Sequence, residues 1–329
     1  MAELSFSRAL QLALKDSMES DPAVVLFGED VAASGGVFGV SRGLLAAMGE
    51  DRVRDTPISE GVIAGMAVGA ALGGLRPVVE VMFMDFTTLA MDALVNQAAK
   101  VHFMSGDQCS VPMVLRTPHG GGLSAGPQHS QCLEAWFAHV PGLKVVIPGS
   151  VQDAYGLLRA AIEDPDPIVF VEHKALYGLK EPFDATASVP PIGAARVLRP
   201  GSDLTFVSYG ASLRVVAEAA KTLATQGIEA EIIDLRSVQP WDRDLVVESV
   251  NRTRRLLVVH EAVTAFGVGA EIAATAAEAC FDRLLAPVRR IGADFSPVPF
   301  AQGLEKAYGP GVAEIVEAAH ALYAVGDRQ

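Results

Sequence analysis

Residues 59–81 read SEGVIAGMAVGAALGGLRPVVEV, and this stretch decides the fold. Its first part, Ser59–Leu72, is typical of a helix, and its last part, Pro77–Val81, is a short β-branched run. Strands that are buried on both faces of a parallel sheet are apolar and nearly continuous, as this run is. A helix followed directly by such a strand is one repeating unit of an α/β domain.

The same alternation continues on both sides of this stretch. We expect further buried strands at Val24–Phe27, Val111–Leu115, Lys144–Ile147 and Ile168–Val171. We expect helices at Ser5–Met18, Thr87–Met104 and Val151–Glu163. This rhythm predicts an α/β domain with a parallel sheet and right-handed crossovers over residues 1–184.

The rhythm breaks in a proline-rich stretch, which predicts an extended linker at 185–200. A second α/β domain follows at 201–329, so the fold class is α/β with two parallel-sheet domains. Its expected strands are Leu204–Ser208, Glu231–Ile233, Leu256–Val259 and Val288–Ile291. Its expected helices are Ser212–Gln226, Asp242–Asn251, Gly269–Cys280 and Ala313–Tyr323.

Charge and composition exclude several classes of function. The formal net charge is −13, and an acidic chain lacks the basic surface that nucleic acid or anionic lipid requires. The longest apolar run, 61–75, is too short to span a bilayer, which takes about 20 residues. We therefore expect no nucleic-acid partner and no membrane association. The N-terminus has no signal-peptide pattern, so a bacterial cytoplasmic location is expected.

The three cysteines, Cys109, Cys132 and Cys280, are far apart, and no CxxC occurs. Their spacing supports neither a zinc site nor a disulfide framework, and reduced thiols are expected.

One short motif points to a hydrolase. Gly122-Leu-Ser-Ala-Gly126 matches the GxSxG nucleophile elbow, which needs a strand, a sharp turn and a helix in immediate succession. Here the strand is expected to end near Thr117, and Pro127 disfavours a helix directly after the motif. A flexible glycine-rich loop is the better interpretation, and an α/β hydrolase that uses Ser124 stays an alternative.

Glu60 opens the helix of the fold-deciding stretch, with Ser59 as its expected N-cap. Glycine recurs every four residues after it, at Gly61, Gly65, Gly69 and Gly73. Each interior glycine costs about 1 kcal/mol relative to alanine. A helix that tolerates four of them predicts close backbone contact across a subunit interface, with Glu60 at its edge. His129 follows a glycine-rich loop after a strand, which is a common place for a functional side chain.

These residues also resemble a known family. Asp55–Glu60 followed by Gly65 and Gly69 resembles the E-x4-G-Φ-x-x-G signature of thiamine-diphosphate enzymes. The whole chain is similar to the β subunit of the decarboxylating component of 2-oxoacid dehydrogenase complexes. The matching strings are Gly28–Asp30, Glu80–Phe86, Gln97–Lys100, Gln128–Gln131, Pro141–Val146 and Phe295–Pro299. Within the family, residues 35–40 and 171–177 look most like acetoin dehydrogenase β chains, with pyruvate and branched-chain types close.

The resemblance implies a transketolase-like pyrimidine-binding domain followed by a transketolase C-terminal domain. It implies an oxidoreductase that is active only with an α subunit in an α2β2 heterotetramer. Such an enzyme cleaves acetoin or decarboxylates a pyruvate-like 2-oxoacid and transfers the acyl group to the lipoyl group of an acyltransferase core. Acetoin, pyruvate and branched-chain 2-oxoacids all remain open as substrates. A non-catalytic subunit that only assembles is a further alternative.

The resemblance also implies roles for single residues. Glu60 matches the glutamate that hydrogen-bonds the aminopyrimidine of thiamine diphosphate, and Phe86 matches an aromatic ring that stacks on it. Glu29, Ile58 and Met82 match residues that line the same pocket. His129 matches an active-site histidine of the acyl-transfer step, for which a proton donor or acceptor near neutral pH is suited.

The resemblance also has implications for two metal ions, K⁺ and Mg²⁺. Several relatives bind a monovalent cation, K⁺, and the matching positions here are Met113, Ala161, Ile162, Asp164 and Asp166. Asparagine is usual at the position of Asp166. The Gly-Asp-Gly…Asn motif that holds diphosphate and Mg²⁺ is absent, since the only asparagines are Asn96 and Asn251 and neither follows a Gly-Asp pair at the required spacing. We therefore expect the α subunit to hold Mg²⁺ and the diphosphate.

Overall fold

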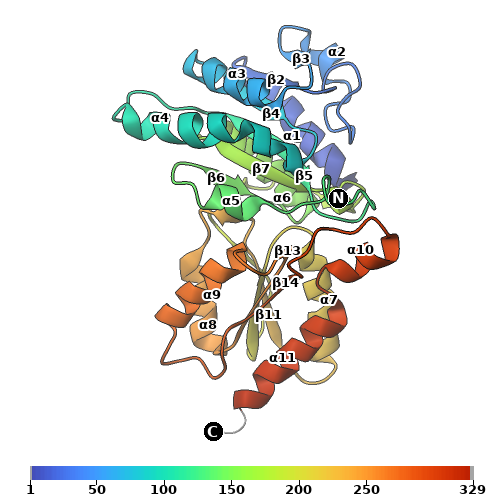
Figure 1. Ribbon diagram of the computed structural model, residues 1–329, viewed down its shortest axis with the longest axis vertical. Coiled ribbons are helices and arrows are strands. Elements are labelled where there is room, and N and C mark those ends of the chain that lie inside the picture. Colours follow the sequence, from blue (N-terminus) through green and yellow to red (C-terminus); the bar gives the residue numbers. More distant parts are fainter. Residues whose placement is uncertain (1, 327–329) are drawn as a thin grey trace.

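The computed structural model describes residues 2–326 and contains two α/β domains that are stacked end to end (Figure 1). A seven-stranded sheet in the order β12-β6-β7-β5-β4-β2-β3 forms the first domain, and a five-stranded sheet in the order β14-β13-β10-β11-β9 forms the second. Both sheets are parallel except at one edge strand each, β12 and β9. The predicted fold class is therefore confirmed. Among the described residues, no helix is long and apolar enough to cross a membrane.

In the first domain the parallel strands are β2 (Val24–Gly28), β3 (Val53–Asp55), β4 (Arg76–Glu80), β5 (Val114–His119), β6 (Lys144–Val146) and β7 (Ile168–His173). The α-helices are α1 (Phe6–Ser20), α2 (Leu44–Met48), α3 (Glu60–Leu72), α4 (Ala99–Met104), α5 (Glu134–Ala138) and α6 (Val151–Glu163). A separate antiparallel pair joins β1 (Ala2–Ser5) to β8 (Lys180–Phe183). Short helical turns are η1 (Met84–Ala90), η2 (Ala93–Ala98) and η3 (Lys174–Leu176).

Alternate residues of each strand enter two different cores, as the pleat of a doubly covered sheet requires. Val78 of β4 packs in the core that contains α1 and α6. Its neighbour Val79 packs in the core that contains α3 and η2. This explains why the strand sequences are apolar without interruption.

The second domain has strands β9 (Arg196–Arg199), β10 (Leu204–Ser208), β11 (Ala230–Asp234), β13 (Leu256–Val263) and β14 (Arg289–Ala293). Its helices are α7 (Ser212–Ala224), α8 (Arg243–Thr253), α9 (Val268–Ala279), α10 (Gln302–Tyr308) and α11 (Val312–Gly326). The strand β12 (Ser237–Gln239) leaves this domain and pairs antiparallel with β6 of the first sheet. The two domains therefore share backbone hydrogen bonds.

Three sequence expectations differ from the structure. The strand expected at Val111–Leu115 is β5, which begins only at Val114, because Pro112 cannot donate to the ladder. The helix expected at Thr87–Met104 is divided into η1, the π-helical η2 and α4. In η1 the hydroxyls of Thr87 and Thr88 bond carbonyls three residues back and so compete with a regular helix. The expected linker contains β9, a short edge strand followed directly by Pro200.

The helix α3 buries Ile63, Ala64, Ala67, Val68 and Ala71 against the sheet. Its glycines Gly61, Gly65 and Gly69 lie on the opposite, exposed side. Ser59 is the N-cap residue of α3, as expected, but its side chain makes no capping hydrogen bond. Close contact of the glycines with another subunit stays a prediction.

A buried ion cluster joins the carboxyl ends of three neighbouring strands. Arg116 of β5 is 1% exposed and donates through Nε and Nη2 to the two carboxylate oxygens of Glu172 in β7, at 2.7 and 2.8 Å. Its Nη1 donates to Glu80 of β4 at 2.7 Å. The Tyr177 hydroxyl donates to Glu172 at 2.8 Å. Two buried carboxylates thus share one guanidinium.

We predict that Arg116→Met destabilises the chain by about 3–5 kcal/mol, because it leaves two buried carboxylates without their cation. Urea unfolding of both proteins measures this difference. Arg54→Met is the matched control: Arg54 pairs with Asp51 at 3.2 Å on the surface, where an ion pair contributes about 1 kcal/mol or less. An Arg116→Met chain as stable as the control would refute the prediction.

Candidate active site

Two buried carboxyl groups meet at the carboxyl end of the first sheet. Glu29 follows β2 directly, and Glu60 is the first residue of α3, which follows β3. Because β2 and β3 are paired in parallel, with Gly28 opposite Asp55, their ends lie at the same sheet edge. Glu29 is 2% exposed and Glu60 is 6% exposed. The N-terminus of α3 provides a favourable field for a carboxylate at Glu60.

Burial and the charge of Glu60 raise the pKa of Glu29 to about 7. The Oε1 atom of Glu29 is buried and has no hydrogen-bond partner. Buried polar atoms are nearly always hydrogen-bonded, so this carboxyl group is available to a ligand. A ring that carries both donors and acceptors would suit the pair.

An aromatic cluster lies at the ends of β4 and β5. The Phe86 and His129 rings have centroids 5.3 Å apart, and Phe83 lies 5.9 Å from Phe86 and 5.0 Å from His129. All three contacts are edge-to-face, which is a favoured geometry. The structure thus brings together Phe86 and His129, which were expected to act in one site.

The other two expected pocket residues lie at the same sheet edge. Ile58, between β3 and α3, is 77% exposed, and Met82, after β4, is half-buried. This edge of the isolated chain is therefore open beside Glu60, where Ile58 presents an uncovered apolar side chain.

The sequence analysis gave no role to Phe83, Asp85 and Lys174, which lie in this region. Lys174 donates to the backbone carbonyl of His129, and its Nζ lies 5.3 Å from the centre of the Phe83 ring. Burial lowers the pKa of Lys174. Asp85 accepts a 2.8 Å hydrogen bond from Gln131 and keeps its buried Oδ2 unpartnered. Their position in the sequence could have pointed to them, because they lie inside the strings 80–86 and 171–177, which match the family.

The residues expected to bind K⁺ lie together, but two protein cations already engage their oxygens. Arg76 donates to the carbonyls of Ile162 at 2.9 Å and Asp164 at 3.3 Å. The Lys144 ammonium lies 2.7 Å from the Asp164 carboxylate and 3.1 Å from that of Asp166. The other two expected positions, Met113 and Ala161, are buried beside them. These contacts engage several of the expected donor oxygens in this structure, and the K⁺ site stays a prediction.

The nucleophile elbow is not formed around Ser124. The motif lies in a loop after β5, and no helix begins before Glu134. The Ser124 hydroxyl lies 3.3 Å from Glu305, whose carboxylate also accepts the backbone amides of Gly122 and Ser124. No described histidine bonds this hydroxyl, and nothing supports the hydrolase alternative.

The pair His260-Glu261 lies in β13, and each side chain has its own buried contacts. Glu261 contacts His173 at 2.5 Å and accepts the amide of Gly121 at 2.6 Å. Burial alone would raise the pKa of Glu261, but the nearby His173, the amide of Gly121 and His119 together outweigh it and hold this pKa at about 2. His260 is fully buried, and a Cβ at Gly267 or Gly269 would lie 2.7 Å from its ring. The absence of a side chain at Gly267 and at Gly269 therefore leaves room for the His260 ring.

Two family models match the chain in succession. The transketolase pyrimidine-binding domain matches residues 2–180, and the transketolase C-terminal domain matches residues 193–315. Among solved structures, a split-gene transketolase in an inactive β4 tetramer covers 98% of this chain and 99% of its own, with a TM-score of 0.80 at 23% identity. At this identity the likeness shows the fold alone.

Curated relatives are similar along nearly the whole chain. The rice mitochondrial pyruvate dehydrogenase E1 component subunit beta-2 is 46% identical, over 96% of this chain and 85% of its own length. The acetoin:2,6-dichlorophenolindophenol oxidoreductase subunit beta of Cupriavidus necator is 44% identical, over 96% of both. The 2-oxoisovalerate dehydrogenase subunit beta of Bacillus subtilis is 42% identical, over 93% of this chain and 94% of its own. The chain therefore belongs to the family of β subunits of the decarboxylating component of 2-oxoacid and acetoin dehydrogenases.

Proposed function

We propose that this chain holds the aminopyrimidine half of thiamine diphosphate and works with an α subunit that holds the diphosphate and Mg²⁺. The buried Glu29–Glu60 pair is the observation that carries the proposal, because it places an unpartnered carboxyl oxygen beside a second carboxyl group at the sheet edge. The bound cofactor would supply carbanion stabilisation. This chain would supply binding, orientation and proton control.

Each site residue then has one task. Glu60 keeps a proton at the pyrimidine ring nitrogen, and the burial of its carboxyl group excludes competing water. Phe86 offers an aromatic face for stacking. His129, which Lys174 holds through its backbone carbonyl, donates or accepts a proton at the acyl group during transfer to the lipoyl group of an acyltransferase core.

The exposed apolar edge beside Glu60 supports an active site that is shared with an α subunit in an α2β2 assembly. Large apolar side chains around α3 are exposed, among them Ile58, Val62 and Met66 at 77%, 56% and 50%. The glycine stripe of α3 lies next to them, and exposed apolar patches of this kind mark protein contacts. The missing Gly-Asp-Gly…Asn motif requires that another chain supply the diphosphate and Mg²⁺ contacts.

The substrate is acetoin, pyruvate or a branched-chain 2-oxoacid. The relatives named for these three substrate types are 44%, 46% and 42% identical, so similarity does not select one. Dye reduction by the αβ complex with the three substrates side by side would decide. The relatives include bacterial and plant mitochondrial proteins, and the bacterial cytoplasmic location stays a proposal.

We predict that Glu60→Gln lowers dye reduction by the αβ complex by about 10²- to 10⁴-fold, because the amide cannot exchange a proton with the ring. Ser124→Ala is the control and leaves the rate unchanged. A Glu60→Gln complex that keeps its rate would favour the non-catalytic assembly subunit.

We predict that His129→Ala separates two activities. Transfer of the acyl group to a lipoyl domain falls by about 10²-fold or more, because the proton donor or acceptor of that step is lost. Dye reduction bypasses the lipoyl group and falls by much less. Both rates are measured on the same complex, with His139→Ala, an exposed histidine, as the control. An equal loss in both assays would contradict the assigned step.

We predict that Glu29 makes the folded chain less stable as pH rises from 4.5 to about 7. The folded pKa of about 7 lies above the ordinary value of 4.5, so the folded state binds this proton more tightly than the unfolded state does. The resulting stabilisation is complete below pH 4.5 and is lost above about pH 7. Urea unfolding near both limits should show a smaller loss in Glu29→Gln than in the natural chain. Parallel pH profiles would refute the shift.

A further inference from the structure

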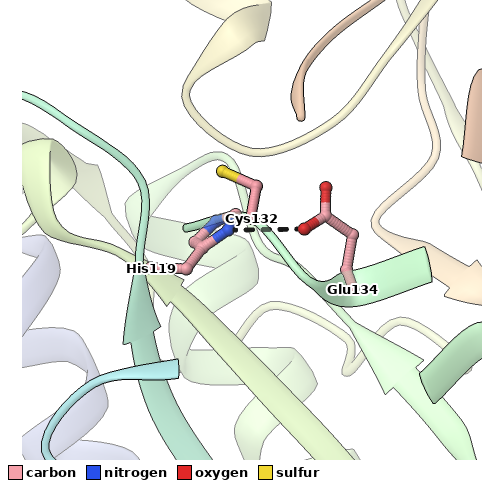
Figure 2. A group of neighbouring side chains, drawn as sticks. All are labelled: His119, Cys132 and Glu134. Carbon is pink, nitrogen blue, oxygen red and sulfur yellow. Dashed lines mark ion pairs between the residues drawn. The ribbon is translucent and has the colours of Figure 1, made fainter. Parts of the chain in front are cut away.

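A separate cluster of side chains lies where the two domains meet, and no role above includes it. His119 is the last residue of β5, Cys132 lies in the loop before α5, and Glu134 is the first residue of α5. Figure 2 shows the three side chains next to one another, with an ion pair between His119 and Glu134 and the Cys132 sulfur beside the imidazole. Among the described residues, this is the one group of histidine, cysteine and acidic side chains whose arrangement could hold a metal ion.

The spacing of the donor atoms is close to that of a metal site. One nitrogen, one sulfur and one oxygen all lie within 4.8 Å of one another. His119 Nδ1 and Glu134 Oε2 are 3.7 Å apart, which is too long for a hydrogen bond. Around a tetrahedral zinc ion with bonds of about 2.0–2.3 Å, neighbouring ligand atoms are about 3.3–3.7 Å apart. Small side-chain movements would close the site.

The potential ligands lack other partners. His119 is 3% exposed, and neither of its ring nitrogens has a hydrogen-bond partner. Glu134 is fully buried, and its Oε2 is likewise unpartnered. Its Oε1 accepts a 2.8 Å hydrogen bond from Tyr209 of the second domain, which fixes the carboxylate. His119 Nδ1 and Glu134 Oε2 face each other as an ion pair at 3.7 Å without a hydrogen bond, and His119 Nε2 has no partner at all, which points to a missing partner in this buried place.

We infer that His119, Cys132 and Glu134 together bind one divalent cation of the zinc type. A nitrogen, a sulfur and an oxygen ligand suit this borderline-soft class, whereas Mg²⁺ and Ca²⁺ prefer oxygen alone. A cavity of about 420 Å³, lined by Cys132, Glu261 and Tyr308, gives access for a water molecule as fourth ligand.

Metal binding at this site depends on pH, because the thiol must lose its proton. Burial raises the pKa of the Cys132 thiol well above its ordinary value, so the free site holds a thiol. Metal binding breaks the S–H bond, forms the metal–sulfur bond and releases the proton to water. The site is independent of the proposed cofactor chemistry.

Cobalt(II) titration of the full, untagged chain tests the site. We expect one equivalent of Co²⁺ to give a thiolate-to-cobalt charge-transfer absorption and the strong visible bands of a tetrahedral ion, and Zn²⁺ to abolish both. Mg²⁺ should not compete. Cys132→Ser should lose the charge-transfer absorption, while Cys280→Ser, a buried cysteine of the second domain, should keep it.

Glu134→Gln provides a second, milder variant, because glutamine can still accept the Tyr209 hydrogen bond. It should weaken Zn²⁺ binding by about 10- to 100-fold or more, since even residues that only support a metal ligand contribute this much. Circular dichroism of each metal-free variant reports its fold. The inference is overturned if the natural chain gives no charge-transfer absorption, if Cys132→Ser keeps it, or if folded Glu134→Gln binds Zn²⁺ as tightly as the natural chain.

Discussion

The ion cluster of Arg116, Glu80 and Glu172 is the constraint on which the rest of the first domain depends. It locks the carboxyl ends of β4, β5 and β7 at fixed positions, because one guanidinium must reach carboxylates on both sides. The segments that leave these three ends carry Phe83 and Phe86, then His129, then Lys174. The aromatic cluster and the lysine that holds His129 are therefore placed by a buried charge balance.

The second domain completes this arrangement from outside. Glu261 and Glu305 accept the backbone amides of the glycine-rich loop that leads to His129, and β12 extends the first sheet beside β6. A glycine-rich loop has little conformational preference of its own. Acidic side chains from another domain supply the order that its sequence lacks, so both domains build this loop although the first carries its residues.

Local patterns predicted much of this structure, and long-range pairing explains what they missed. The strand at Leu204–Ser208 was predicted to the residue, because its apolar run reflects burial on both faces. The strand β12 was not predicted, because its partner β6 lies in the other domain and its own sequence is short and partly polar. The ion pair between Lys144 and Asp166 was not predicted either, because the two residues are far apart in the sequence, although aspartate is unusual at position 166. His119, Cys132 and Glu134 match no ligand spacing, since a strand end and a distant helix start bring them together.

The exposed apolar edge beside Glu60 gives a physical reason for the proposed division of the cofactor between two chains. A buried carboxyl pair with an unpartnered oxygen is unfavourable in an isolated fold, because the desolvation of Glu29 Oε1 is not offset by a hydrogen bond. Exposed apolar side chains such as Ile58 and Met66 add a second unfavourable feature around it. Both features are relieved together when a partner covers the apolar surface and a ligand bonds the carboxyl groups. Assembly and cofactor binding then stabilise the same state, and each favours the other without any further contact between them.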